Sequence, residues 1–115
     1  MNKYLLLAIL SLWSFSTPRA AAPTGQQLLE ACETAFKKDL QGTEALFCEW
    51  YATPCDCEAI RPADAPRVCL PENYDVQELS RKLLTGLRAA PELKQKQAAT
   101  AAAIILARDY PCQPH

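Results

Sequence analysis

The sequence predicts an all-α fold, a small domain of four helices arranged as two helical hairpins and stapled by disulfides. Apolar residues recur at helical spacing in segments bounded by capping and chain-breaking residues. No segment of useful length shows the apolar–polar alternation of a half-buried strand. The chain has six cysteines among 115 residues, and an even count in a short exported protein is typical of a disulfide framework.

Residues 1–22 have the layout of a secretory signal peptide. Lys3 precedes an apolar run from Tyr4 to Trp13, and small and polar residues follow to Ala22. A run of about ten apolar residues is half of the roughly 20 that a membrane-spanning helix needs, so we expect cleavage near Ala20–Ala22 rather than a retained anchor. Residues 23–115 then form a single domain in an oxidising compartment such as a bacterial periplasm, without a membrane segment.

Two helices are expected in the first half of this domain. Thr24 and Gln27 fit a capping box, and an apolar stripe that starts at Leu28 predicts a first helix to about Asp39. Gln41-Gly42 breaks the helical pattern, Thr43 is the expected cap of the second helix, and Pro54 ends it.

The second helix carries an aromatic cluster. Phe47, Trp50 and Tyr51 stand at positions i, i+3 and i+4 and so share one bulky face. We interpret this face as part of the core; the alternative is a face on which a ligand stacks.

Residues 53–73 contain four prolines and no sustained apolar period, which predicts a long loop. Loops of this length in small domains tend to be functional or disordered. Beyond it, Asp75 and Glu78 fit a second capping box, and the third helix runs to Ala89-Ala90. Pro91 suits the first turn of a fourth helix, which we expect to continue to about Asp109. Its alanine-rich middle lets a neighbouring helix approach closely, either from the same chain or from a second copy.

The hairpin arrangement predicts two disulfides. Cys32 and Cys48 lie at similar distances on either side of the Gln41-Gly42 turn, so antiparallel helices place them opposite each other. Cys69 precedes the third helix and Cys112 follows the fourth, and the same reasoning pairs them. Each bridge would add roughly 2–4 kcal/mol of stability in the chain-entropy model.

Cys55 and Cys57 are left over, separated by Asp56 in the loop. They could form a third disulfide, pair across a dimer or stay free, and a Cys-x-Cys pair can also bind a soft metal or exchange disulfides.

Composition argues against several functions. Removal of Lys3 and Arg19 with the leader leaves 10 of the 12 basic residues and all 13 acidic residues, so the mature chain has a net charge near −3. The chain also lacks the basic stripe that is typical of a nucleic-acid-binding protein. The one histidine, His115, is the last residue and a poor base for nucleophilic catalysis. Three unclustered glycines form no phosphate-binding loop. We therefore expect no enzyme, no cofactor and no metal site.

Six short motifs occur in an order that resembles the Rap/Tai family of periplasmic immunity proteins. They are Leu28-Leu29-Glu30-Ala31-Cys32, Phe47-Cys48 followed by Tyr51, Val68-Cys69-Leu70-Pro71, Gln77-Glu78-Leu79, Ala90-Pro91-Glu92 and Tyr110-Pro111-Cys112. The resemblance covers nearly all of the mature chain, and the four cysteines of the family fall on the two pairs predicted above. Glu49-Trp50, where the family often has small residues, and the Cys55-x-Cys57 pair depart from its pattern.

The resemblance implies an all-helical, often dimeric protein that protects a bacterium from a type VI secretion effector, typically a papain-like peptidoglycan amidase, by occluding its active-site cleft. A second copy of the chain is then a further expected partner. A pre-organised loop suits such an inhibitor because rigidity lowers the ordering cost of binding. The candidate contact residues all lie in the loop: Asp56, Glu58, Arg61, Asp64 and Arg67. The alternatives are a periplasmic accessory or structural binding protein without a toxin partner, and a Cys-x-Cys redox or metal-handling protein.

Overall fold

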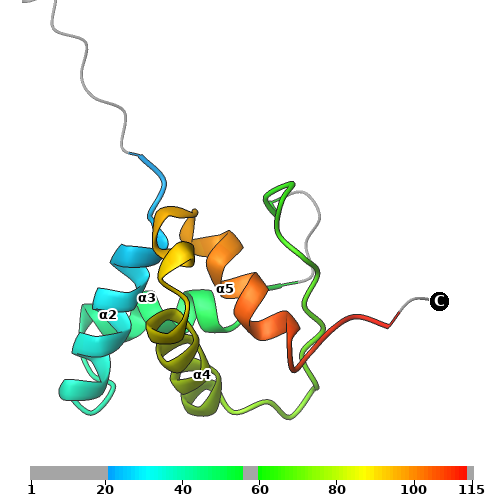
Figure 1. Ribbon diagram of the computed structural model, residues 1–115. Coiled ribbons are helices and arrows are strands. Elements are labelled where there is room, and N and C mark those ends of the chain that lie inside the picture. The colour runs from blue at the N-terminus through cyan, green and yellow to red at the C-terminus, as the bar shows by residue number, and fades with distance from the viewer. Residues whose placement is uncertain (1–20, 56–59, 114–115) are drawn as a thin grey trace, which may run out of the picture.

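The computed structural model describes residues 21–55 and 60–113. The helices are α2 (Gly25–Lys37), α3 (Thr43–Ala52), α4 (Val76–Ala89), the short 3-10 helix η1 (Pro91–Gln95) and α5 (Ala98–Ala107) (Figure 1). Within the described residues, extended pairing is limited to two isolated bridges, Thr24 with Gln97 and Val68 with Pro111. The predicted all-α fold class is confirmed.

Helices α2 and α3 form the first hairpin. The predicted capping box is present, since Thr24 Oγ1 accepts from the Gln27 amide at 3.2 Å and Gln27 Oε1 accepts from the Thr24 amide at 2.9 Å. The prediction that Thr43 caps α3 is wrong: the cap residue is Gly42, whose φ of 96° favours glycine, and Thr43 is already helical. The predicted Cys32–Cys48 disulfide joins the two helices, with Cα atoms 5.1 Å apart.

Helix α4 opens the second hairpin. The Asp75 side chain caps it by accepting from the Gln77 amide at 3.0 Å. The second predicted disulfide, Cys69–Cys112, is confirmed, with Cα atoms 4.9 Å apart, and it ties the entry of α4 to the exit of α5.

The predicted continuous fourth helix from Pro91 is wrong, because the chain straightens between η1 and α5. Lys96 has an extended ψ of 163°. Its carbonyl accepts from the Gly25 amide at 2.8 Å, and the Ala98 amide donates to the Pro23 carbonyl at 2.8 Å. The start of α2 and the residue Pro23 before it thus bond to a carbonyl and an amide that a continuous helix would pair internally.

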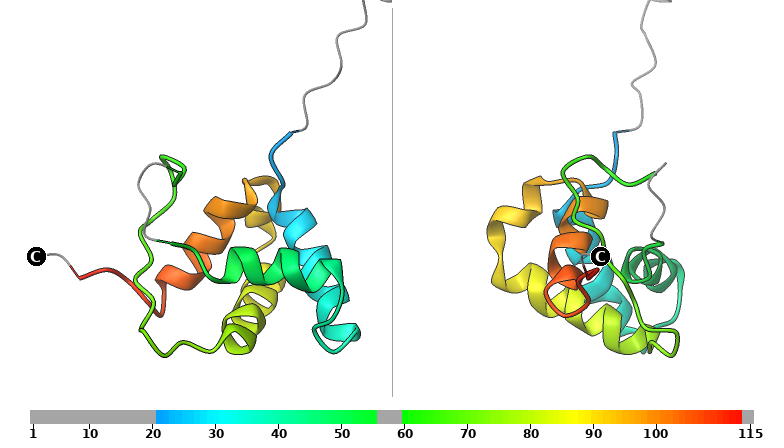
Figure 2. Two further views of the ribbon diagram at one scale, coloured as in Figure 1. Left: turned by 180° about the vertical axis from the view of Figure 1, so that it is seen from behind. Right: turned by 90° about the vertical axis from the view of Figure 1, so that its right-hand side faces the viewer.

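The core lies where α2, α4 and α5 meet, with α3 packed on α2. Its fully buried large side chains are leucines, namely Leu28, Leu79, Leu83, Leu87 and Leu106. Helix α5 approaches α4 closely at Gly86, since a Cβ added there would lie 2.7 Å from Ile105 Cγ2. Residues 60–75 run past α5 before the chain enters α4 (Figure 2). No helix in the described part of the chain is long and apolar enough to cross a membrane.

Candidate partner-binding site

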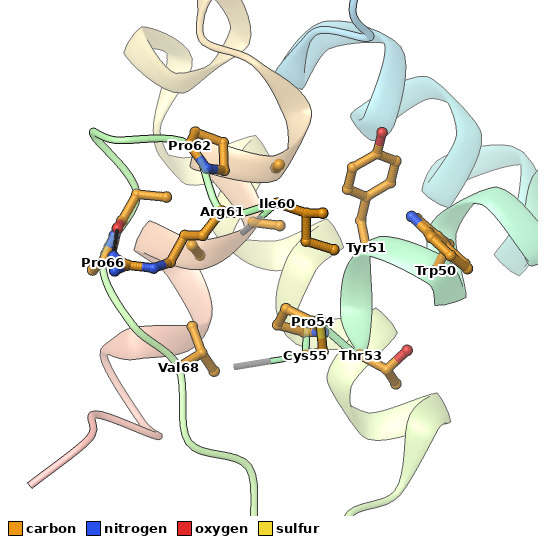
Figure 3. A pocket seen from close by; sticks show the side chains of 14 residues that line it. Trp50, Tyr51, Thr53, Pro54, Cys55, Ile60, Arg61, Pro62, Pro66 and Val68 are labelled. Carbon is orange, nitrogen blue, oxygen red and sulfur yellow. Dashed lines mark hydrogen bonds between the residues drawn. The ribbon is translucent and has the colours of Figure 1, made fainter. Parts of the chain in front are cut away.

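A pocket of about 490 Å³ lies between the end of α3, the segment 60–68 and α5 (Figure 3). Among the described residues its lining is mostly apolar, and Arg61 is the one charged residue of that described lining. Trp50 and Tyr51 come from α3, and three alanines come from α5. The remaining lining residues are Thr53, Pro54, Cys55, Ile60, Pro62, Ala65, Pro66 and Val68.

Hydrogen bonds within the segment 60–68 shape one wall of this pocket. Arg61 Nη1 donates to the Ala65 carbonyl at 2.7 Å, so the half-buried guanidinium closes a short turn. Asp64 Oδ1 accepts from the Thr100 hydroxyl at 2.9 Å and thereby ties the segment to α5. Ala65 and Val68 are buried, so the segment is packed onto the domain at two points.

The residues predicted to contact a partner fall into three groups. Asp56 and Glu58 lie outside the described residues. Arg61 and Asp64 hold the segment 60–68 in shape through the two bonds above. Arg67 is exposed. Their role in partner contact stays a prediction.

The aromatic cluster does not form one core face. Phe47 and Tyr51 are half-buried with ring centroids 5.1 Å apart, but the Trp50 side chain is 72% exposed, so the assignment of Trp50 to the core is wrong. Helix α3 instead buries small residues, namely Ala45, Cys48 and Ala52. Leu46 is 69% exposed and lies one turn before Trp50 on the outward face.

The sequence did contain a signal for this orientation. Because the predicted bridge to Cys32 fixes Cys48 toward α2, the residues three before and four after Cys48 must share its buried face. Trp50, two residues along, then lies on the opposite side of the helix.

Cys55 lines the pocket and is disulfide-bonded. Cys57 lies outside the described residues, so a Cys55–Cys57 bridge stays a prediction. No group of three or more metal-ligating side chains occurs in the part of the chain that the structure describes. Away from the pocket, a hydrogen bond to Asp109 raises the pKa of Lys82 above its usual 10.5.

These features define the protein as a small, disulfide-stapled helical domain with an apolar pocket. The chain matches the family model of the Rap1a immunity proteins over residues 24–112, and it therefore belongs to that family. No match was found among curated proteins or among solved structures. The family assignment agrees with the resemblance read from the six motifs.

Proposed function

We propose that this protein is a periplasmic immunity protein that binds and inhibits a type VI secretion effector. The effector class that we infer is a peptidoglycan amidase, and inhibition works by occluding its active-site cleft. The observation that carries the proposal is the Rap1a family match, which spans the described helices and both described disulfides. Families of this kind act by binding a toxin rather than by catalysis.

The location follows from the chemistry of the fold. The first 22 residues have the pattern of a signal peptide, and the domain after them depends on disulfides that persist in oxidising compartments. We propose that the leader is removed and that the mature chain acts in the periplasm. The intact mass of the protein isolated from the periplasm should correspond to a chain that starts near residue 23.

The test of function is a pull-down with the tagged mature protein, folded under oxidising conditions, against extracts of its source cells. Recovery of a small amidase-like hydrolase in a stoichiometric complex, followed by loss of its peptidoglycan-cleaving activity when the protein is added, is the expected result. Repeated recovery of nothing, or of envelope assembly proteins alone, would instead indicate an accessory role.

The segment 60–68 is the proposed element that approaches the toxin cleft. Because Arg61 and Asp64 maintain its shape, Arg61→Ala and Asp64→Ala should weaken toxin binding through the conformation of the segment. Arg67 is exposed, and Arg67→Ala extends the test to the solvent-facing side of the segment. Unchanged affinity in all three variants would remove this segment from the proposed interface.

A further inference from the structure

We infer that the leader is cut after Ala20, so that the mature chain begins at Ala21 and its new ammonium group lies beside Glu44. This inference rests on the proposed removal of the leader. It adds to that proposal the bond that is cut and the place of the new terminus in the fold.

Residues 23–25 are bound into the domain, which limits where the chain can be cut. The Pro23 carbonyl accepts from the Ala98 amide, and the Gly25 amide donates to the Lys96 carbonyl, both at 2.8 Å. In Figure 1 this segment meets the chain where η1 passes into α5. Gly25 is buried, and a Cβ added to it would collide with the Leu93 carbonyl oxygen. A chain that began beyond Pro23 would leave the first amide of α5 without its acceptor, so the cleaved bond lies before Pro23.

Three bonds in the expected range remain, and the neighbouring residues decide between them. Leaders of exported proteins carry small residues at their last and third-last positions. A cut after Ala22 fits this pattern, but it falls at the bond to Pro23, whose nitrogen has no proton and whose carbonyl is held by α5. A cut after Ala21 would place the long, charged Arg19 at the third-last position. A cut after Ala20 puts an uncharged proline there and leaves two exposed alanines ahead of the held residues, which favours this bond.

A second concavity supports a start at Ala21. It is a groove of about 370 Å³, and the described residues that line it are Ala21, Pro23, Gln27, Ala31, Thr43, Glu44 and Phe47. Glu44 is half-buried and is the one charged residue of this described lining. Its carboxylate lies 3.8 Å from Lys38 Nζ, which is too far for a hydrogen bond. Because Ala21 forms part of the groove, a cut before it creates a cation next to this carboxylate.

The first test expresses the full chain in its source cells and identifies the periplasmic product by intact mass and N-terminal sequencing. The wild type should yield residues 21–115. Ala20→Leu places a large side chain at the last leader position and should abolish this product and leave precursor. Ala22→Leu is the matched control, because it changes an exposed residue after the cut and should be processed as the wild type is. A product that starts at Ala22 or Pro23, or a block by Ala22→Leu alone, would overturn the inference.

The second test measures the pKa of the terminal amine of the mature protein by NMR titration at low salt. The carboxylate of Glu44 should raise this pKa, and Glu44→Gln should lower it by roughly 0.2–0.7 pH units, as for an exposed ion pair. Glu49→Gln, which removes a carboxylate of α3 outside the described lining of the groove, is the control and should have little effect. An unchanged pKa in Glu44→Gln would refute the contact. A wild-type chain that keeps its leader would contradict the proposed export itself, whereas a cut at another bond would contradict this inference alone.

Discussion

Gly86 is the residue that lets α4 pack directly against α5. A Cβ at this position would meet three atoms of Ile105 at 2.7–3.0 Å, and Ile105 is itself buried and stiff at its branched Cβ. In an ordinary helix interior, replacing glycine by alanine stabilises by about 1 kcal/mol. Here overpacking should outweigh that gain, because neither helix can move without disturbing the leucine core.

We therefore expect Gly86→Ala to lower the free energy of unfolding by about 1–3 kcal/mol, measured by urea denaturation. The matched control is Thr85→Ala, an exposed position in the same helical turn, which should change stability by less than about 0.5 kcal/mol. If Gly86→Ala proves as stable as the wild type, the close contact between α4 and α5 is wrong.

Trp50 illustrates what single residues do and do not reveal in the sequence. The spacing of Phe47, Trp50 and Tyr51 correctly indicated a helix, but volume suggested that these large side chains face the core. Helix α3 is apolar on nearly every side, so periodicity cannot tell its buried face from its exposed face. The disulfide decides between them, since Cys48 turns the small residues inward and leaves Leu46 and Trp50 outside.

At the scale of elements, a hydrogen bond to a buried hydroxyl of α5 helps to hold the segment 60–68 in place. Thr100 is 1% exposed, and its hydroxyl donates to Asp64. Asp64→Ala would leave this hydroxyl buried without that partner, at a cost of about 1–3 kcal/mol. We expect lower stability and faster amide hydrogen exchange across residues 60–68, with little change in α2.

A double-mutant cycle isolates this contact. Thr100→Val keeps the shape of the side chain and removes the hydroxyl, so the double variant Asp64→Ala/Thr100→Val should be more stable than Asp64→Ala alone. Additive losses in the two single variants would mean that the hydrogen bond does not anchor the segment.

The boundaries of the elements show how far local sequence signals reach. The Thr24 capping box is a local pattern, and the structure contains it as predicted. The interruption at Lys96 has no local signal, because it arises from hydrogen bonds to Pro23 and Gly25, more than 70 positions earlier in the chain. The pocket depends in the same way on distant segments of the chain. The loop and the aromatic helix can each be predicted from the local sequence, but the contact of both with α5 cannot.

At the scale of the whole molecule, the two described disulfides have different roles. Cys32 and Cys48 are 0% exposed and belong to the core, whereas Cys69 is exposed and Cys112 partly so. The bridge between Cys69 and Cys112 links residues 43 apart in sequence, against 16 for the core bridge. In the chain-entropy model these loops correspond to about 4 and about 3 kcal/mol, so the surface bridge contributes the larger share of stability.

Because thiolate attack requires access to a sulfur atom, brief treatment with dithiothreitol should reduce Cys69–Cys112 before Cys32–Cys48. Alkylation followed by peptide mass spectrometry would show label at Cys69 and Cys112 first. Loss of this bridge loosens the end of the segment 60–68 that forms one pocket wall, while the hairpin of α2 and α3 stays closed. Since Trp13 lies in the expected leader, Trp50 is the single tryptophan of the mature chain, and its fluorescence should change at this stage while helical circular dichroism is largely retained. Label that enters the core pair first, or fluorescence that changes only together with helix loss, would show that the pocket and the core unfold as one unit.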